Sequence, residues 1–353
     1  MKMKLTFAAL ALIAAGCSNQ ELTEAVQDGQ DSNARVITLQ ATMPETADEA
    51  PATRVTYESD GATVSGIVMT WRTDDKLLLC FKYGGNYYRK EAAIVPSSIS
   101  TDRKQARFTI EIPASIPASA AFDFYAVYQQ NRRNSGVSGC FEAGTPNYQF
   151  EEREYWNVTL DKKGTNYWRD GIINPVLLFS RTNVTTAQLG ALKLDLAHTG
   201  WIMALHLTNA SGAQMDLPKY INMQYPTEPA SSFIWNGRQG SYAVKMDVTT
   251  RIVASYIPGW EDKAGIYFTV NEAGYPLYRG RLGIGSTRIL YRWVVSTPQI
   301  EQMRATMMLP DGTSALSTNL LPARTVQNGK VYHVFMKWDG TNLTLTKRDG
   351  TPY

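Results

Sequence analysis

The sequence predicts an all-β protein with minimal helix, arranged as two tandem β-sandwich domains. Short runs of alternating or continuous apolar residues recur along the chain, separated by turns rich in Gly, Asn and Asp. A pattern typical of a short helical turn is confined to one stretch, Thr186–Leu194. The 353 residues are enough for two domains, since one domain takes roughly 100–200 residues.

The strands predicted for the first domain follow from their alternation. In Val36–Met43, residues Ile37, Leu39, Ala41 and Met43 oppose Val36, Thr38, Gln40 and Thr42, which is typical of a half-buried strand. Gly84-Gly85 between two tyrosine-flanked runs predicts a tight hairpin, because glycine tolerates positive φ. The other predicted strands are Val55–Tyr57, Ile67–Trp71, Lys76–Tyr83, Arg107–Ile112, Phe122–Tyr128 and Ile173–Phe179.

The second domain is predicted to begin near residue 190, so that the domains span 36–190 and 191–353. Leu192–Thr208 is interpreted as a strand pair or as one long bent strand. Further strands are predicted at Ser232–Trp235, Tyr242–Val248, Ile252–Ile257, Gly265–Val270, Leu277–Gly283, Val331–Lys337 and Leu343–Thr346. No repeat of fixed length is visible, which argues against a propeller or a solenoid.

The first residues are typical of an export signal. Lys2 and Lys4 form a short positive region before an apolar run, 5–15, that is too short to span a membrane as a helix. Ala14-Ala15-Gly16-Cys17 resembles a bacterial lipobox, so we predict a signal peptide over 1–16 and a lipid-modified Cys17. An ordinary signal peptide with an incidental cysteine is the alternative. Residues 17–35 are polar and read as a flexible leader.

The composition predicts neither a nucleic-acid partner nor a cofactor. The formal net charge is +3, and the charges are scattered rather than gathered in a basic stripe. His198 and His206 lie eight residues apart, on one face of a predicted strand, yet no further ligand follows at metal-binding spacing. Cys80 and Cys140 are compatible with one disulfide or with a buried thiol at Cys80.

Catalytic signals are weak, and we predict that the protein is not an enzyme. The carboxylate pairs Asp74-Asp75 and Glu151-Glu152 are interpreted as solvated, with a glycosidase as the alternative. Tyr148–Trp168 concentrates aromatic residues in an irregular stretch, where exposed rings would stack on sugars. A surface glycan-binding lipoprotein of two β-sandwich modules is therefore the alternative function.

Several stretches, taken in order, resemble the fimbrillin family, the lipoprotein pilins of Bacteroidales type V pili. The lipobox cysteine and polar leader come first, followed by the strand Val36–Met43 and a loop that ends at Thr53-Arg54. Trp71 with Asp74-Asp75 resembles the family's W-x-x-x-D-x-h pattern. Leu194–Asn209 and Gly329–Tyr332 resemble the opening and closing strands of the second domain. Each motif alone is unspecific, and their order carries the resemblance.

The resemblance implies two transthyretin-like sandwiches and assembly by protease-triggered donor-strand exchange. The precursor would travel to the outer membrane as a lipoprotein. Its first strand would form a removable edge of the first sandwich. An arginine-specific protease would cut after it, and a strand of another pilin subunit would fill the slot. The implied location is the outer membrane and cell surface, with other subunits and host or bacterial surface glycans or proteins as partners.

Two arginines flank the displaced strand, and they differ in what a cut would achieve. Cleavage at Arg35 would leave Val36–Met43 in place, whereas Arg54 follows it in a Pro-rich loop, Pro44–Arg54. Arg54 is therefore the predicted processing site. Leu343 and Leu345 mark a short candidate donor strand, which is alternatively the last strand of the second sandwich. This short C-terminus leaves a tip, accessory or non-polymerising role open.

Overall fold

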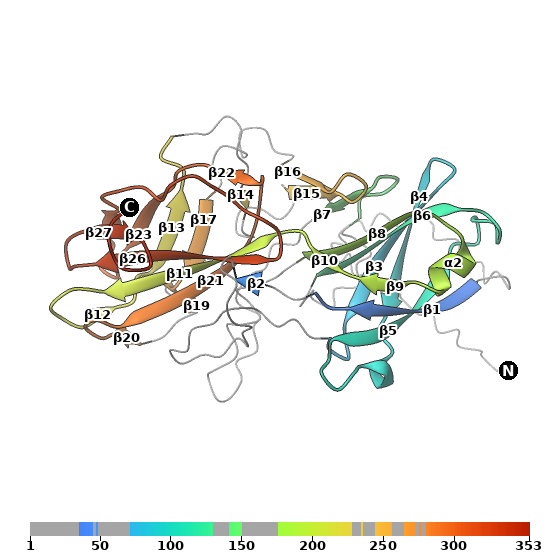
Figure 1. Cartoon of the computed structure of the whole chain (residues 1–353), viewed down its shortest axis with the longest axis horizontal. Helices are drawn as coiled ribbons and strands as arrows, with labels where there is room; N and C mark the ends of the chain where they lie inside the picture. Colours follow the sequence, from blue (N-terminus) through green and yellow to red (C-terminus); the bar gives the residue numbers. More distant parts are fainter. Residues whose placement is uncertain are drawn as a thin grey trace, which may run out of the picture.

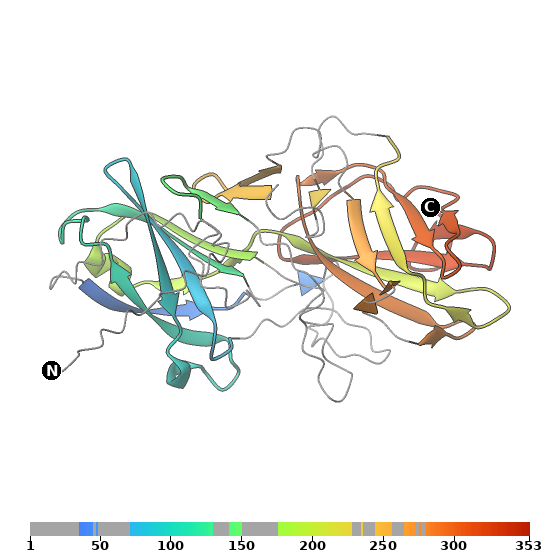
Figure 2. The same ribbon diagram turned by 180° about the vertical axis from the view of Figure 1, so that it is seen from behind.

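The computed structural model describes residues 35–44, 47–48, 71–129, 141–149, 176–227, 234–235, 244–255, 265–272, 275–276 and 280–353. These residues form strands almost throughout, in two lobes that lie end to end (Figures 1 and 2), so the predicted all-β fold is confirmed. Within them the α-helix is α2 (Thr186–Gly190), inside the stretch predicted to be helical. Thr185 begins it with a capping box that includes Gln188.

The first lobe is a sandwich of two sheets. One sheet has the strand order β5-β1-β9, and the other has the order β10-β8-β6-β3-β4. The bounds are β1 (Arg35–Thr42), β3 (Lys76–Tyr83), β4 (Asn86–Ala93), β5 (Gln105–Ile112), β6 (Phe122–Gln129), β8 (Val176–Val184), β9 (Lys193–Asp195) and β10 (Ala197–His198). The short 3-10 helix η1 (Pro96–Ser98) lies between β4 and β5.

The core of the first lobe follows from strand alternation. Leu77, Leu79 and Phe81 of β3 lie in one buried cluster with Phe108 of β5, whereas Leu78 and Cys80 of β3 belong to a different cluster. The two faces of β3 are therefore both buried, which explains its nearly continuous apolar sequence. The hairpin turn between β3 and β4 is as predicted, with positive φ at both glycines.

The second lobe pairs a six-stranded sheet with a four-stranded one. The larger sheet has the order β14-β21-β11-β26-β2, with β27 also paired to β26, and the smaller has the order β17-β13-β23-β24. The bounds are β2 (Ala47–Asp48), β11 (Trp201–Asn209), β13 (Tyr220–Gln224), β14 (Ile234–Trp235), β17 (Gly265–Thr269), β21 (Thr287–Ser296), β23 (Arg304–Met308), β24 (Ser314–Leu316), β26 (Lys330–Trp338) and β27 (Leu343–Thr346).

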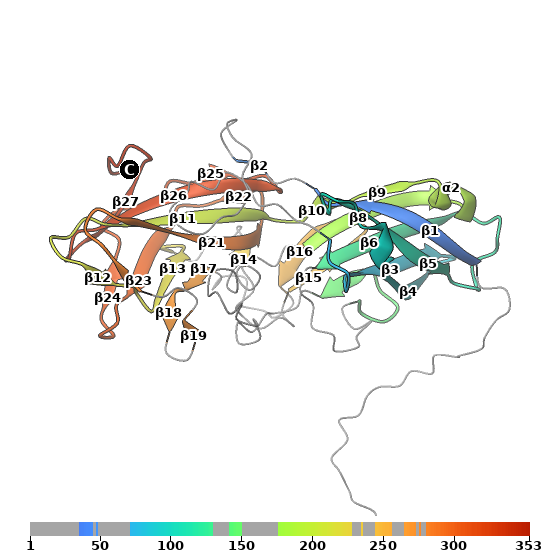
Figure 3. The same cartoon turned by 90° about the horizontal axis from the view of Figure 1, so that it is seen from below.

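Four small sheets complete the fold. Three are two-stranded: β12 (Met215–Asp216) with β20 (Arg281–Leu282), β18 (Asn271–Glu272) with β19 (Tyr275–Pro276), and β22 (Gln299–Ile300) with β25 (Arg324–Thr325). The fourth has the order β16-β15-β7 and joins the halves of the chain, since β7 (Asn147–Gln149) pairs with β15 (Val244–Asp247), which pairs with β16 (Ile252–Ser255). Figure 3 shows this sheet between the lobes.

The two lobes share a buried cluster. Met246 and Val248 from the second half of the chain belong to the same cluster as Leu78, Cys80 and the core of the second lobe. Lys245 and Glu142 add an ion pair of 2.9 Å between the same segments. The lobes are therefore interlocked rather than linked by one connection.

The passage between the lobes lies somewhat later in the chain than the predicted boundary after residue 190. β9 pairs with β1 and β10 pairs with β8, so both still belong to the first lobe. β11, which begins at Trp201, is the first strand of this stretch in the second lobe. Leu192–Thr208 is thus neither a strand pair nor one bent strand but three strands, two in one lobe and one in the other.

Among the strands that were not predicted are β13, β21 and β23, and β21, the longest of these, shows why. β21 contains Arg292, which is buried and whose Nε donates to the Tyr267 carbonyl at 2.7 Å. A buried arginine interrupts the apolar pattern by which a strand is found in a sequence. β13 and β23 each alternate buried and half-buried residues over only five positions. The predicted strand Val55–Tyr57 and most of Ile67–Trp71 lie outside the described residues.

Trp71 and Asp75, four residues apart, hold the turn that leads into β3. The Trp71 ring is buried edge-on against Phe108 and Tyr128, at centroid distances of 4.9 and 5.0 Å. Asp75 accepts hydrogen bonds from the Arg72 backbone N–H at 2.7 Å and from the Tyr128 hydroxyl at 3.1 Å. The interpretation of both carboxylates as solvated is wrong for Asp75, which is 8% exposed and whose Oδ2 accepts both of these hydrogen bonds.

Burial raises the pKa of Asp75 from 3.8 to about 6, with the two hydrogen bonds opposing the shift. The folded state therefore binds a proton more tightly than the unfolded state does. The stability that this proton contributes is fully present below pH 3.8 and is lost as the pH rises through about 6.

We expect the Asp75→Asn variant to lose this pH dependence. From pH 4 to pH 7, the free energy of unfolding of the wild type should fall relative to that of Asp75→Asn by about 2–3 kcal/mol, the equivalent of two pKa units. Urea unfolding of both proteins at several pH values measures the difference. The comparison with Asp75→Asn at each pH cancels the contributions of other groups, and parallel curves would contradict the expectation.

Candidate functional site

The candidate site is the position of β1 in the first lobe. β1 pairs with β5 in antiparallel register over eight residues, from Arg35↔Ile112 to Thr42↔Gln105. Its other side pairs with β9, in parallel, over Gln40–Thr42. The predicted strand Val36–Met43 is thus present with its bounds shifted by one residue. β5 and β9 are not neighbours of each other, so β1 fills a slot between them.

The expectation that this strand forms an edge of the sheet is corrected by β9. After α2 the chain returns alongside the C-terminal end of β1, and the Leu196 backbone N–H donates to the Thr42 carbonyl at 3.3 Å. The N-terminal half of β1 is paired by β5 and not by β9. β1 is therefore a middle strand that is flanked on both sides only at its C-terminal end.

The inward side chains of β1 fill the core of the first lobe. Leu39 and Ala41 of β1 have no exposed surface, and Met43, which directly follows β1, has 3%. All three belong to the buried cluster that includes Phe108 and Leu194. Val36, which points outward, is 60% exposed. Full burial of a Leu or Met side chain contributes about 1.5–3 kcal/mol. The loss of β1 would thus open an apolar slot as well as two strand edges.

Arg35 anchors the N-terminal end of the strand. Its Nη1 donates to the Thr186 hydroxyl at 2.9 Å at the start of α2, and its Nη2 donates to the Ile116 carbonyl. Its backbone lies within the β1–β5 ladder. A protease that reads arginine needs both a free side chain and an unpaired, extended backbone. In this structure the Arg35 side chain is bonded and its backbone is paired.

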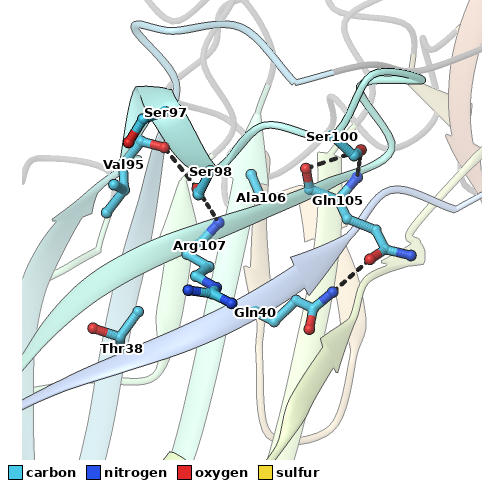
Figure 4. Close-up of a pocket in the computed structure, with 9 residues that line it drawn as sticks. All are labelled: Thr38, Gln40, Val95, Ser97, Ser98, Ser100, Gln105, Ala106 and Arg107. Atoms are coloured by element: carbon cyan, nitrogen blue, oxygen red, sulfur yellow. Dashed lines mark hydrogen bonds between the residues drawn. The ribbon is translucent and has the colours of Figure 1, made fainter.

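A polar pocket of about 590 Å³ lies over the outer face of β1 and β5 (Figure 4). Thr38 and Gln40 of β1 line it together with Arg107 of β5 and the serines of the turn around η1. The Gln40 side-chain amide donates to that of Gln105 at 2.5 Å across the two strands. None of the described residues that line it is aromatic.

Several predicted site residues lie outside the described part of the chain. Cys17 and Arg54 are among them, as are Cys140, Glu151-Glu152 and most of Tyr148–Trp168. Lipidation, processing and glycan stacking at these positions stay predictions. Within the described residues, no helix is long and apolar enough to span a membrane.

Leu343 and Leu345, the candidate donor residues, lie in β27 and have no exposed surface. β27 pairs with β26, and the Asn319 side chain bonds the Leu345 backbone on its other side, donating at 2.8 Å and accepting at 2.9 Å. In this structure β27 completes the second lobe, the other interpretation offered by the sequence. Donation to another subunit would require it to leave β26.

The histidines are not arranged as their spacing suggested. His198 lies in β10 of the first lobe, whereas His206 lies in β11 of the second lobe, where its Nε2 and the Nδ1 of His333 are 2.8 Å apart. Burial and the neighbouring His333 lower the pKa of His206 to about 3, so this histidine is neutral at pH 7. No group of three or more metal-ligating residues occurs within the described ranges.

Cys80 is a buried free thiol, and burial raises its pKa to about 12. The thiolate, which is the reactive form, is therefore suppressed at neutral pH. The slot that β1 fills is the candidate site within the described chain. If it were vacated, it would offer unpaired backbone groups for strand pairing over apolar pockets.

No protein-family model and no curated protein matches the chain. Solved structures with some similarity include a protein described as a cell adhesion protein from Bacteroides ovatus, at 13% identity and a TM-score of 0.44, covering 91% of this chain and 98% of that one. The tip fimbrial protein from Porphyromonas gingivalis with a C-terminal truncation has 10% identity and a TM-score of 0.34, covering 88% and 98%.

A fimbrial assembly protein from Parabacteroides distasonis has 9% identity and a TM-score of 0.34, covering 88% of this chain and 94% of that one.

The two faces of β1 should respond differently to truncation. We expect Leu39→Ala to lower the free energy of unfolding by about 2–4 kcal/mol, because it leaves a cavity in the closed core. The matched control Val36→Ala, on the exposed face of the same strand, should change it by less than about 0.5 kcal/mol. Urea unfolding measures both, and equal effects would show that β1 is not held by its inward face.

Proposed function

We propose that the chain is a structural and adhesive subunit of a type V, fimbrillin-type pilus at the bacterial cell surface. It would be exported as a lipoprotein through Cys17 and activated when an arginine-specific protease cuts at Arg54. The observation that supports this most is the place of β1, which fills a slot between β5 and β9 and precedes Arg54 in the chain.

A removable strand must be bound tightly before cleavage and be replaceable after it. The eight-residue ladder with β5 and the buried Leu39 and Ala41 supply the first property. The strand is replaceable because the pairing is made by backbone groups. Any extended strand with small or apolar residues at the inward positions can reproduce this pairing. The vacated slot would expose unpaired edges, which are unfavourable in water and bind strands readily.

The position of the cut decides whether the slot opens. Arg35 is tied to Thr186 and Ile116 and lies inside the ladder, so a cut there is not supported. A cut at Arg54 separates both the lipid-bearing segment and β1 from the rest of the chain in one step. The freed N-terminal piece would be held only by non-covalent pairing, which another subunit can replace.

The strand that a subunit would donate is less closely defined by the structure than the slot that accepts it. β27 with Leu343 and Leu345 is a candidate, but its burial in the second lobe means that donation competes with its own lobe. A subunit whose β27 stays in place would accept a strand and donate none. Such a subunit would serve as a tip or accessory subunit rather than as part of the shaft.

We expect Arg54→Gln to abolish processing and assembly. Wild-type protein treated with an arginine-specific protease should lose its N-terminal piece and form ladders on an unheated gel, whereas Arg54→Gln should stay monomeric. Mass spectrometry of the new N-terminus identifies the cut. Arg35→Gln is the matched control and should be processed like the wild type. Ladders formed by Arg54→Gln, or surface-sheared material that still begins at Cys17, would refute the proposal.

A further inference from the structure

The pocket over the outer face of β1 and β5 has the size of a small-molecule site. Its volume of about 590 Å³ lies within the roughly 300–1,000 Å³ that ligand pockets usually have. β1 and β5 form its floor, and the turn around η1, residues 95–100, forms its wall (Figure 4). This space is sufficient for a ligand of the size of a sugar.

The wall of the pocket is held in place by hydrogen bonds of the protein itself. The Ser98 hydroxyl donates to the Val95 carbonyl at 2.6 Å and accepts from the Arg107 backbone N–H at 2.7 Å, so it ties η1 to β5. At the other end of the turn, the Gln105 backbone N–H donates to the Ser100 hydroxyl and the Ser100 backbone N–H donates to the Gln105 carbonyl, both at 2.9 Å. The pocket is thus formed before a ligand arrives, which lowers the entropy cost of binding.

The floor of the pocket presents polar groups that the protein does not use. The Gln40 side-chain amide donates to that of Gln105, which leaves the oxygen of the first and the nitrogen of the second for a ligand. The Arg107 guanidinium has no hydrogen-bond or ion partner within the described part of the chain. The hydroxyl of Thr38 lies on the same exposed face. Hydroxyl groups of a ligand both donate and accept, so they match this mixed set.

The charge of the lining selects for an anionic ligand. Among the described residues that line the pocket, Arg107 is charged and none carries a carboxylate. A guanidinium pairs with a carboxylate through two parallel hydrogen bonds, which is the strongest contact that this set of side chains offers. A ligand with one carboxylate and several hydroxyl groups therefore uses all the groups on the floor.

We propose that this pocket binds a sugar that carries a carboxylate, with the carboxylate on Arg107 and ring hydroxyls on the two glutamines. The inference goes beyond the proposed function and concerns the chain with β1 in place. Gln40 and Arg107 are partners in the β1–β5 register, so the bound sugar bridges the two strands. Because it binds only when both strands are present, it stabilises β1 in its slot.

NMR titration of the full chain tests the class of ligand. The probes are glucuronic acid, galacturonic acid and N-acetylneuraminic acid, each compared with its neutral methyl ester. We expect at least one acid to bind in the millimolar range, as is usual for a ligand of this size. Its ester should bind at least about tenfold more weakly, because it cannot form the charged pair with Arg107.

Three variants identify the pocket as the place of binding. Arg107→Gln should lower the affinity for the acid at least about tenfold and remove the difference between acid and ester. Gln40→Ala should lower it about two- to tenfold, the effect of one neutral hydrogen bond. Val36→Ala, exposed on the same strand but outside the pocket, is the matched control and should bind like the wild type. Urea unfolding checks that the variants are folded.

The outcomes separate the site from its ligand. Absence of binding by all three acids, equal binding of acid and ester, or unchanged binding by Arg107→Gln would overturn the site. Tighter binding of a tetraglutamate peptide than of every sugar would assign the pocket to acidic peptides and overturn the sugar. None of these measurements requires cleavage at Arg54, so their failure leaves the proposed function untouched.

Discussion

The pairing of β1 with β5 and β9 is the constraint on which the first lobe depends. β5 and β9 lie two positions apart in their sheet, and β1 is the strand that joins them. It also carries the inward residues Leu39 and Ala41 into the core. A strand from the start of the described chain thus closes a sheet whose other members lie far along the sequence. Its loss would open this sheet and uncover the core that it shares with the opposite sheet.

The lobes would stay together without this strand because other contacts interlock them. The β7–β15 pairing brings residues from the second half of the chain against the first lobe, supported by the Lys245–Glu142 ion pair. Residues on the outer face of β3 share a buried cluster with the core of the second lobe. These contacts do not involve Arg35–Asp48, so we expect the two lobes to stay associated if that piece is removed.

The sequence was informative where one physical signal dominates. β3 and β27 were predicted to the residue. β3 is a short apolar run bounded by turns, whereas β27 and the inward face of β1 followed from alternation of apolar and polar residues. It failed where tertiary contacts override the local pattern. The buried Arg292 interrupts the apolar pattern of β21, so that strand was not predicted. Asp75 is buried, although its position next to Asp74 suggested a solvated pair.

The site itself was predicted only in part. Alternation identified the strand, but no local signal could show that β9 would return beside it or that His206 would meet His333 from a distant strand. The same holds for β2, which is two residues long and whose partner lies far along the chain. Such pairings depend on topology, and local periodicity contains no information about them.

The asymmetry of β1 gives its release a direction. Its N-terminal end is anchored by the Arg35 guanidinium, which bonds α2 and the Ile116 carbonyl. Its C-terminal end continues into β2, which pairs over only two residues and lies nearest to Arg54. A piece cut at Arg54 would therefore detach from the second lobe first and from Arg35 last. The slot around Ala41 and Leu39 would then be uncovered before the Arg35 anchor is released, so that its C-terminal end is the first part free to pair with an incoming strand.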